Sequence, residues 1–257
     1  MQVDWTQQVV MVTGASSGIG RALAIELGRR GASVGLLARR AAALAEIVRE
    51  VETVGGRALA LPADVTDANA VRAAADELRA QFGRVDVLVA NAGVGGQVGG
   101  PQFDARDVAD VLNINVVGAA NSIAAVVPEM IERGRGQLVA ISSLAAYRGL
   151  PKSAPYCASK AALTAMCESL RLDLGGTGVD VTIIHPGFIK TQLTAIRHAR
   201  MPYLMELDAA IKKIVRAIEQ RRKIYSFPWQ LASLVRLGLI MPVAFYDRIA
   251  MRNSFRE

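Results

Sequence analysis

The sequence has little of the side-chain chemistry that binds metals or forms disulfides. Its 257 residues include two cysteines and two histidines. Cys157 and Cys167 fall in one expected helix, which places their α-carbons about 15 Å apart, beyond the reach of a disulfide. His185 precedes a proline and His198 stands alone, so neither has the spacing of a metal site. We therefore expect two free thiols and no bound metal.

The chain also lacks a long uninterrupted apolar segment. The N-terminus, MQVDWTQQVVMVTG, has neither the basic flank nor the apolar centre of a signal peptide. The apolar run at 231–245 is interrupted by Arg236 and Pro242, and it is shorter than the roughly 18 to 20 residues that a spanning helix requires. These absences predict a cytoplasmic protein, with peripheral membrane contact of the C-terminal tail as an open alternative.

Positive charge is concentrated at the C-terminal end. The formal net charge is +7, yet residues 1–196 contain 18 Lys+Arg and 18 Asp+Glu, whereas residues 197–257 contain 12 and 5. No zinc-finger spacing, RNP-like aromatic motif or compact basic helix accompanies this excess. The distribution therefore indicates a local surface with a particular partner, and it argues against a nucleic-acid-binding protein.

The hydrophobic pattern is that of an α/β domain. Short runs rich in Val, Ile, Leu and Ala alternate with longer amphipathic segments, and no linker or repeat divides residues 1–190. Strands that are apolar on both faces and alternate with helices predict a parallel sheet covered on both sides. The expected strands are 9–13, 33–38, 57–63, 85–90, 136–142, 179–185 and 223–227. The expected helices are 18–30, 40–54, 67–82, 105–132, 155–174 and 209–223.

A glycine-rich segment, VTGASSGIGRALAIEL, follows the first expected strand and opens the first helix. Its glycines are Gly14, Gly18 and Gly20. Such a turn lets backbone N–H groups approach a pyrophosphate, and the helix N-terminus adds the positive end of its dipole. The spacing is G-x-x-x-G-x-G, and the absence of G-K-[ST] excludes a P-loop. We interpret the segment as a dinucleotide site, although a plain structural turn would explain one or two of the glycines.

The end of the second expected strand bears on the choice of cofactor. In dinucleotide folds an acidic residue there binds the ribose 2′-hydroxyl, whereas an arginine accommodates a 2′-phosphate. Here the strand ends LLARRAA, with Ala38 at the acidic position and Arg39 and Arg40 after it. The pattern favours NADP(H) over NAD(H); the alternative is a solvated basic helix start.

The segment PYCASKAAL places a phenol and an ammonium on one helical face. Tyr156 and Lys160 are four residues apart, and side chains at this spacing are neighbours on a helix. A positive charge beside the phenol favours the phenolate and lowers the tyrosine pKa from its usual value of about 10. The pair therefore predicts a general acid and base.

Taken together, these motifs resemble the short-chain dehydrogenase/reductase (SDR) family. The resemblance rests on TGASSGIG at 13–20, NAG at 91–93, NINVVG at 113–118, ISS at 141–143, YCASK at 156–160 and HPG at 185–187. It covers residues 8–191. It implies a Rossmann-like, doubly wound parallel sheet with helices on both faces. We therefore expect a single domain over 1–257, in which 192–223 form a substrate-binding lid and 228–257 a helical extension.

The resemblance implies a role for each catalytic position. Tyr156 would exchange a proton with the substrate oxygen, and Ser143 would hydrogen-bond that oxygen. Ser142 is the weaker candidate, because the family's thirteen-residue interval before the tyrosine falls on Ser143. Lys160 would also bind the nicotinamide ribose, and Asn115 would hold a water in a proton relay. Asn113 has the wrong offset from the glycine that follows, so we interpret it as structural.

The resemblance also implies a set of cofactor-binding residues. Asp64 and Val65 would contact the adenine, Asn91 would steady the central sheet, and Pro186 and Gly187 would pass beneath the nicotinamide. The full expected set is Gly14, Ser16, Ser17, Gly18, Ile19, Gly20, Arg39, Asp64, Val65, Asn91, Ala92, Gly93, Tyr156, Lys160, Pro186, Gly187 and Thr191.

The implied activity is hydride transfer between NADP(H) and a carbonyl or secondary alcohol. The apolar lid segment favours a small hydrophobic substrate of the lipid, sterol or aromatic ketone type. Two alternatives remain: reduction of a 3-oxoacyl group on an acyl carrier protein, and a cofactor-binding sensor or scaffold without turnover.

The resemblance further implies a homodimer or homotetramer, with the helices at 105–132 and 155–174 as its interface. For the tail we keep three partners open. These are a second subunit, an anionic membrane surface and an acidic carrier protein.

Overall fold

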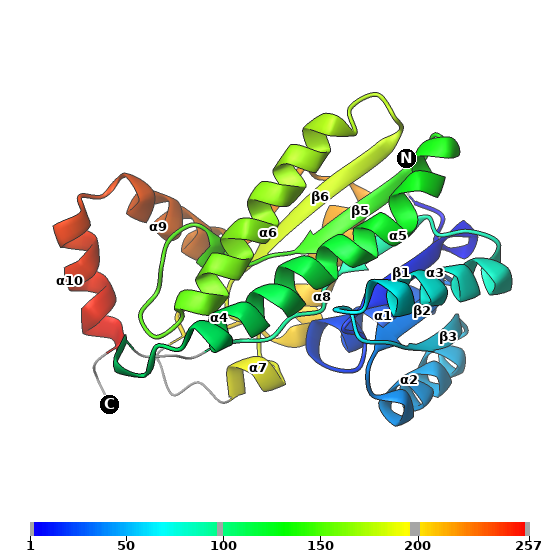
Figure 1. Ribbon diagram of the computed structural model, residues 1–257, viewed down its shortest axis with the longest axis horizontal. Helices are drawn as coiled ribbons and strands as arrows, with labels where there is room; N and C mark the ends of the chain where they lie inside the picture. The colour runs from blue at the N-terminus through cyan, green and yellow to red at the C-terminus, as the bar shows by residue number, and fades with distance from the viewer. Residues whose placement is uncertain (1–2, 97–99, 196–200, 255–257) are drawn as a thin grey trace.

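The computed structural model describes residues 3–96, 100–195 and 201–254. Its centre is a seven-stranded sheet in the order β3-β2-β1-β4-β5-β6-β7, and every neighbouring pair is parallel (Figure 1). The strands are β1 (Val9–Thr13), β2 (Ser33–Ala38), β3 (Arg57–Pro62), β4 (Val87–Ala90), β5 (Gly136–Ile141), β6 (Val179–Pro186) and β7 (Ile224–Phe227). The strand order reverses between β1 and β4, and in such sheets ligands bind at the carboxyl ends beside this switch point.

Helices cover both faces of the sheet because the strands present apolar side chains to both. In β1, Val10 and Val12 belong to the core on one face, whereas Val9 and Met11 belong to the core on the other. The first core contains α1 (Gly18–Arg29), α2 (Ala41–Thr53) and α8 (Leu207–Glu219). The second contains α3 (Ala68–Phe82), α5 (Gly118–Glu132) and α6 (Ala154–Asp173). The fold is a single Rossmann-like domain, as the sequence predicts.

The expectation of one regular helix over 105–132 needs a correction. The segment consists of α4 (Ala105–Leu112), a π-helical turn η3 (Asn113–Val117) and α5. The N–H of Gly118 donates to the carbonyl oxygen of Asn113, five residues back. The run Ala105–Glu132 is long and apolar enough to cross a membrane, but Ile123, Val126 and Met130 pack against the sheet. This helix is therefore part of the core.

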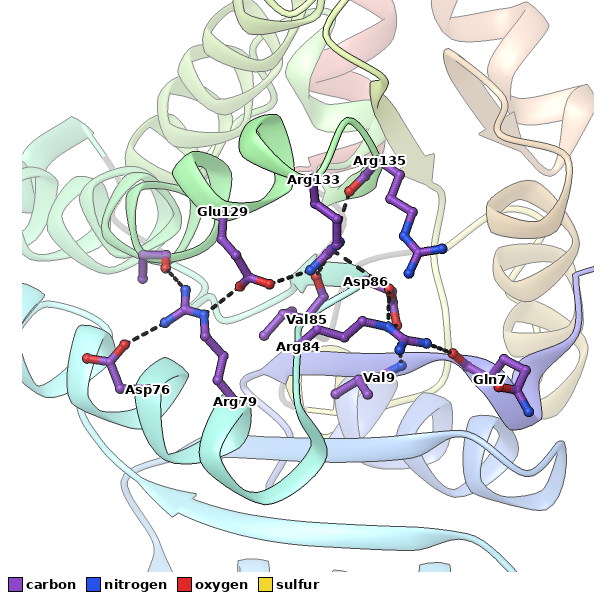
Figure 2. A network of polar contacts seen from close by, with 11 residues as sticks. Gln7, Val9, Asp76, Arg79, Arg84, Val85, Asp86, Glu129, Arg133 and Arg135 are labelled. Carbon is purple, nitrogen blue, oxygen red and sulfur yellow. Dashed lines mark hydrogen bonds and ion pairs between the residues drawn. The ribbon is translucent and has the colours of Figure 1, made fainter.

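A network of ion pairs joins the amino-terminal edge of the sheet to its helices (Figure 2). Asp86, just before β4, accepts a hydrogen bond from the backbone N–H of Val9 and two from the guanidinium of Arg84. Arg133, which directly follows α5, lies 3.7 Å from the same carboxylate and also pairs with Glu129, which binds Arg79 of α3. This network stands at the end of the sheet away from the carboxyl ends of the strands.

The C-terminal region adds elements that the sequence predicted only coarsely. The expected lid includes α7 (Gln192–Ala195), but His198 lies outside the described residues. After β7 the chain forms α9 (Trp229–Ile240) and α10 (Val243–Ser254), which stand at one end of the molecule (Figure 1). Four short helical elements complete the chain: η1 (Trp5–Gln7), η2 (Gly100–Gln102), η3 and η4 (Leu144–Ala146).

Candidate functional site

The glycine turn after β1 has the backbone shape that its composition predicts. Gly14 and Gly18 have φ angles of +65° and +53°, a conformation that side chains with a Cβ rarely adopt. A Cβ on Gly14 would also lie 2.7 Å from Cα of Ala92. The turn leads directly into α1, so the helix N-terminus faces the space above the turn. This is the geometry that binds a phosphate through backbone N–H groups.

Gly20, in the first turn of α1, packs closely against the glycine turn. A Cβ on Gly20 would lie 2.4 Å from the carbonyl oxygen of Gly14 and 2.6 Å from Nδ2 of Asn91. Gly20 is buried and does not line the cavity described below. Its hydrogen atom therefore allows the close packing of α1 on the turn, and its direct contact with the cofactor stays a prediction.

Asn91 ties the carboxyl end of β4 to that of β1. Its Nδ2 donates to the carbonyl oxygen of Thr13 at 2.9 Å, and the backbone N–H groups of Asn91 and Ala92 both donate to the Thr13 hydroxyl at 3.0 Å. These bonds hold the two strands together at the switch point. Asn91 also lines the cavity, as do Ala92 and Gly93.

The carboxyl ends of six strands enclose one cavity of about 380 Å³. Sequence reasoning placed most of its lining residues at the site, and of the residues it singled out only Gly20 and Asn115 lie outside the lining. The expected residues that line it are Gly14, Ser16, Ser17, Gly18, Ile19, Arg39, Asp64, Val65, Asn91, Ala92, Gly93, Ser143, Tyr156, Lys160, Pro186, Gly187 and Thr191. The structure thus brings the glycine turn and the Ser–Tyr–Lys set into a single cavity.

Lys160 is buried beneath the cavity wall. It lies on α6, one turn after Tyr156, and only 4% of its surface is exposed. The ammonium nitrogen donates to the carbonyl oxygen of Ile141 at 2.8 Å and lies 5.8 Å from the centroid of the Tyr156 ring. Burial lowers the pKa of Lys160 to about 8. The ammonium is thus held close to the tyrosine ring by a backbone acceptor on β5.

The two serines after β5 have different surroundings. Ser142 is buried, and its hydroxyl donates to the carbonyl oxygen of Lys160 at 3.1 Å and bonds the Thr164 hydroxyl at 2.8 Å. The Ser143 hydroxyl accepts from the N–H of Ala145 at 3.1 Å and makes a long contact of 3.5 Å to the carbonyl of Pro186. The Ser142 hydroxyl therefore bonds only groups of α6. The Ser143 hydroxyl lines the cavity, and its proton has only the long contact with Pro186.

The hydrogen bonds of Ser142 also assign the tautomer of His185. Because the single Ser142 proton goes to the Lys160 carbonyl, Thr164 must donate to Ser142. Thr164 then accepts the remaining bond, 3.1 Å long, from Nε2–H of His185. His185 Nδ1 is left as an unprotonated acceptor, consistent with its having no hydrogen-bond partner. Burial, with the charges of Arg236 and Lys160, lowers the pKa of His185 to about 4, which favours the neutral ring.

Asn115 lies behind the cavity wall, on the π-helical turn. Its Oδ1 accepts from the N–H of Val94 at 2.8 Å, and its Nδ2 donates to the Val94 carbonyl and to the Ser159 hydroxyl. A Cβ on Gly93 would come within 3.2 Å of the same Oδ1. The side chain joins the turn to the loop after β4 and to α6. A water of the predicted relay would have to bind its backbone carbonyl or the second lone pair of Oδ1.

Three charged residues stand together at the ends of β2 and β3. The Arg39 guanidinium is 70% exposed and lies 3.7 Å from the Asp64 carboxylate. Asp64 accepts from the N–H and hydroxyl of Thr66, and the backbone bond, aided by Arg39, lowers the Asp64 pKa. Arg40 donates to the carbonyl and hydroxyl oxygens of Ser16, both at 3.1 Å. Arg40 therefore reaches the glycine turn.

Sequence reasoning missed Arg40 and most of the apolar lining. Arg40 was noted only as the neighbour of Arg39, although both line the cavity. The same hydrophobic pattern that predicted strands gave no indication of which strand ends would face the site. The remaining lining residues are Ala38, Ala63, Val94, Ile114, Ile141, Ser142, Ile189, Gln192, Leu193 and Thr194.

The residues present fit a dinucleotide. Gly14 and Gly18 line the cavity where α1 begins, so a phosphate there can approach the backbone of the turn, and the cavity continues to Tyr156. Over residues 3–96, 100–195 and 201–254, no group of three or more His, Cys, Asp or Glu is arranged to hold a metal ion.

Comparison with known proteins identifies the family of the chain. The sequence profile of the short chain dehydrogenases matches residues 8–201. An uncharacterized oxidoreductase of Myxococcus xanthus is 43% identical over 249 residues, which cover 97% of this chain and 98% of that protein.

Two solved structures share the fold. A short chain dehydrogenase from Mycobacterium paratuberculosis bound to NAD is 27% identical, with a TM-score of 0.77, over 87% of this chain and 97% of that one. A 3-oxoacyl-[acyl-carrier protein] reductase from Brucella melitensis is 26% identical, with a TM-score of 0.78, over 87% of this chain and 91% of that one. The protein therefore belongs to the short chain dehydrogenase family, whose members are oxidoreductases that use a nicotinamide cofactor.

Proposed function

We propose that the protein is an NADP(H)-dependent oxidoreductase that interconverts the carbonyl and secondary-alcohol forms of a small hydrophobic substrate. The observation that supports it best is the single cavity that unites the glycine turn with Ser143, Tyr156 and Lys160. When bound, the nicotinamide supplies or accepts the hydride. The chain itself must bind and orient the substrate and move one proton.

Tyr156 is the proposed acid and base. In the reducing direction its hydroxyl donates a proton to the carbonyl oxygen, and in the oxidising direction the phenolate takes a proton from the alcohol. The Lys160 ammonium, 5.8 Å from the ring centroid, favours the phenolate. The Ser143 hydroxyl donates to the same substrate oxygen, which its long 3.5 Å contact with the Pro186 carbonyl leaves it able to do.

The hydrophobic substrate is supported by the apolar side chains that line the cavity. Val94, Ile141, Ile189 and Leu193 all line it. Leu193 comes from α7 in the expected lid, and a Cβ on Gly95 would lie 3.0 Å from its Cδ1. Apolar walls with few polar groups suit a ligand that presents one carbonyl oxygen to Ser143 and Tyr156.

The preference for NADP(H) rests on Arg39 and Arg40. Neither the last residue of β2, Ala38, nor the two residues after it supplies a carboxylate for a ribose 2′-hydroxyl. Arg39 is exposed enough to turn toward a phosphate, and Arg40 already bonds the Ser16 end of the glycine turn. The carboxylate of Asp64 beside Arg39 partly offsets this positive charge. Arg40 therefore supplies a second positive charge for binding a 2′-phosphate.

Substitution of Tyr156 tests the chemistry. With NADPH and a panel of hydrophobic ketones, Tyr156→Phe is expected to lower kcat by about 10² to 10⁴-fold because the acid is removed. Cofactor affinity should change little. Tyr225→Phe on β7 is the matched control and should keep wild-type turnover. A Tyr156→Phe variant with near wild-type kcat would overturn the assignment, and tight NADPH binding without turnover of any substrate would favour a sensor instead.

A fluorescence titration with NADPH and NADH tests the cofactor preference. We expect wild type to bind NADPH more tightly, with Arg39→Ala and Arg40→Ala each reducing the ratio of the two affinities. Arg49→Ala removes the same charge from an exposed position of α2 outside the cavity, and it should leave the ratio unchanged. Tighter binding of NADH by wild type would refute the preference.

A second candidate is reduction of a 3-oxoacyl group on an acyl carrier protein. It is favoured by the Brucella melitensis reductase and by the basic C-terminal region, which would attract an acidic carrier. This function predicts activity with the carrier-bound substrate that falls steeply with salt, and little activity with the free thioester. Equal activity on both substrates at all salt concentrations would exclude it.

We also propose that the protein is a homodimer or homotetramer, as is general in the family. The exposed apolar side chains Val117 and Ile131, at the two ends of α5, support an interface on these helices. Sedimentation of wild type and of Ile131→Glu would test it.

A further inference from the structure

An apolar surface covers the outer side of α9 and α10. Nine of the seventeen exposed large hydrophobic residues in the described chain fall within residues 229–251, so the exposure is concentrated there. Ile240 and Trp229 are 81% and 73% exposed, and none of the nine is below 47%. We call these residues the C-terminal apolar surface: Trp229, Leu234, Leu237, Leu239, Ile240, Val243, Phe245, Ile249 and Met251.

One side of α9 is already packed against the rest of the protein. Leu231 and Ala232 of α9 are buried against Leu144, with Tyr147 and Phe188 beside them. The chain has therefore used one side of α9 for its own core. The two helices stand at one end of the molecule (Figure 1), where nine large apolar side chains remain exposed.

Tyr246 joins α10 to the segment before α6 and to α9. The Tyr246 hydroxyl donates to the carbonyl oxygen of Gly149 at 2.5 Å, and the Arg148 guanidinium lies 3.8 Å from the centroid of the Tyr246 ring. Arg148 also donates to the carbonyl oxygens of Gly238 and Met241. A helix of twelve residues is marginal in water without tertiary packing. An apolar patch of this kind marks an interaction site.

The charges around the patch favour a particular occupant. Residues 229–251 contain two arginines, Arg236 and Arg248, and one acidic residue, Asp247, and Arg148 adds a further positive charge against the Tyr246 ring. Arg236 and Arg248 lie among the apolar residues and are exposed. Exposed apolar side chains interleaved with arginines suit the boundary between acyl chains and anionic headgroups. A two-fold contact with a second copy would instead bring this positive face against itself.

The helices are too short to cross a bilayer. Twelve residues of α helix extend about 18 Å, against a hydrocarbon core of about 30 Å, and Pro242 separates α9 from α10. We propose that α9 and α10 form an interfacial docking surface that binds the protein to bilayers rich in anionic phospholipid. This inference does not depend on the identity of the substrate or on the direction of the reaction.

Vesicle co-sedimentation of the full chain tests the proposal. We expect binding to vesicles of phosphatidylcholine and phosphatidylglycerol at about two to one, weaker binding at high salt, and little binding to phosphatidylcholine alone. The triple variant Leu237→Ser, Ile240→Ser, Phe245→Ser should lower the partition coefficient about tenfold or more. The double variant Arg236→Gln, Arg248→Gln should bind anionic vesicles more weakly than wild type, and its binding to phosphatidylcholine vesicles should be unchanged.

Controls separate docking from folding. Leu172→Ser changes a residue that is 69% exposed on α6, outside the surface, and should bind vesicles as wild type does. Circular dichroism and NADPH affinity should be the same for all variants. Of the two tryptophans, Trp5 is 4% and Trp229 is 73% exposed, so a blue shift of emission on vesicle addition would report Trp229, and Trp229→Phe should remove it.

Three results would overturn the proposal. The first is equal binding of the triple variant and wild type to anionic vesicles. The second is no vesicle binding by wild type while its sedimentation shows self-association that the triple variant abolishes, which would assign the surface to a second copy. The third is binding to an acidic carrier protein and to no vesicle.

Discussion

The ammonium nitrogen of Lys160 lies 2.8 Å from the carbonyl oxygen of Ile141, the last residue of β5. This one bond fixes a buried cation beside the tyrosine that the proposed reaction uses. Burial lowers the pKa of Lys160 from 10.5 to about 8. Between these values the unfolded chain binds more protons than the folded one, so stability must rise with pH across this window.

Lys160 therefore predicts a stability gain in alkali. The wild-type free energy of unfolding should gain about 2 kcal/mol from this residue between pH 8 and pH 10. Lys160→Met should lack that gain, whereas Lys212→Met, at an exposed position of α8, should keep it. Urea denaturation at the two pH values measures the difference, and parallel pH profiles for wild type and Lys160→Met would contradict the prediction.

His185 predicts a loss of stability in acid, which is the same direction of change with pH as for Lys160. Its pKa is lowered from 6.5 to about 4, mainly by burial, so the unfolded chain binds the extra proton first as pH falls. Wild type should lose about 2 kcal/mol of stability from this ring between pH 7 and pH 5. His185→Asn removes the titrating group and should show a smaller loss over the same interval. An NMR titration that placed the His185 pKa near 6.5 would exclude this explanation.

Asp86 predicts a stability effect without a catalytic one. Asp86→Ala would leave the N–H of Val9 and the guanidinium of Arg84 without their partner at the amino-terminal edge of the sheet. Breaking a largely buried ion pair in this way costs about 3 kcal/mol, measurable by urea denaturation. The kcat of the folded enzyme should be unchanged because the cavity lies at the opposite edge. A selective loss of kcat with normal stability would contradict this view.

Gly20 predicts a cofactor effect through packing. A methyl group there would lie 2.4 Å from the Gly14 carbonyl oxygen, so Gly20→Ala must displace the glycine turn. Overpacking of this kind costs about 1 to 3 kcal/mol, and we expect NADPH to bind about tenfold more weakly. Gly100→Ala, where an added Cβ meets nothing within 4 Å, is the control. Unchanged affinity in Gly20→Ala would show that the turn can shift freely.

The sheet was predictable because its strands are buried runs bounded by turn residues. The ends of β1 and β2 match the expected ranges, and those of the other strands differ by one or two residues. The Tyr156 and Lys160 pair was equally accessible, since both residues lie on one helix. Local patterns of this kind depend only on neighbours in the chain.

The features that sequence reasoning missed depend on distant partners. Arg40 reaches Ser16, 24 residues earlier, and nothing in LLARRAA separates its role from that of Arg39. Asn115 faces Val94 and Ser159, which are 21 and 44 residues away, so its place behind the cavity wall was not visible. The exposure of α9 and α10 likewise depends on which distant parts of the chain pack against them, and the sequence pattern does not show this.

The π-helical turn at Asn113–Val117 sets the phase of the helix on either side of it. A π turn closes one residue later than an α turn, and each residue of an α-helix advances the side chains by about 100°. Asn115 can therefore meet Val94 while Ile123 and Val126 still face the sheet. If one residue of the turn were deleted, the side chains before and after it would follow one continuous α-helical spacing. The helix could then keep the contact of Asn115 with Val94 or the packing of Ile123 and Val126 on the sheet, but not both.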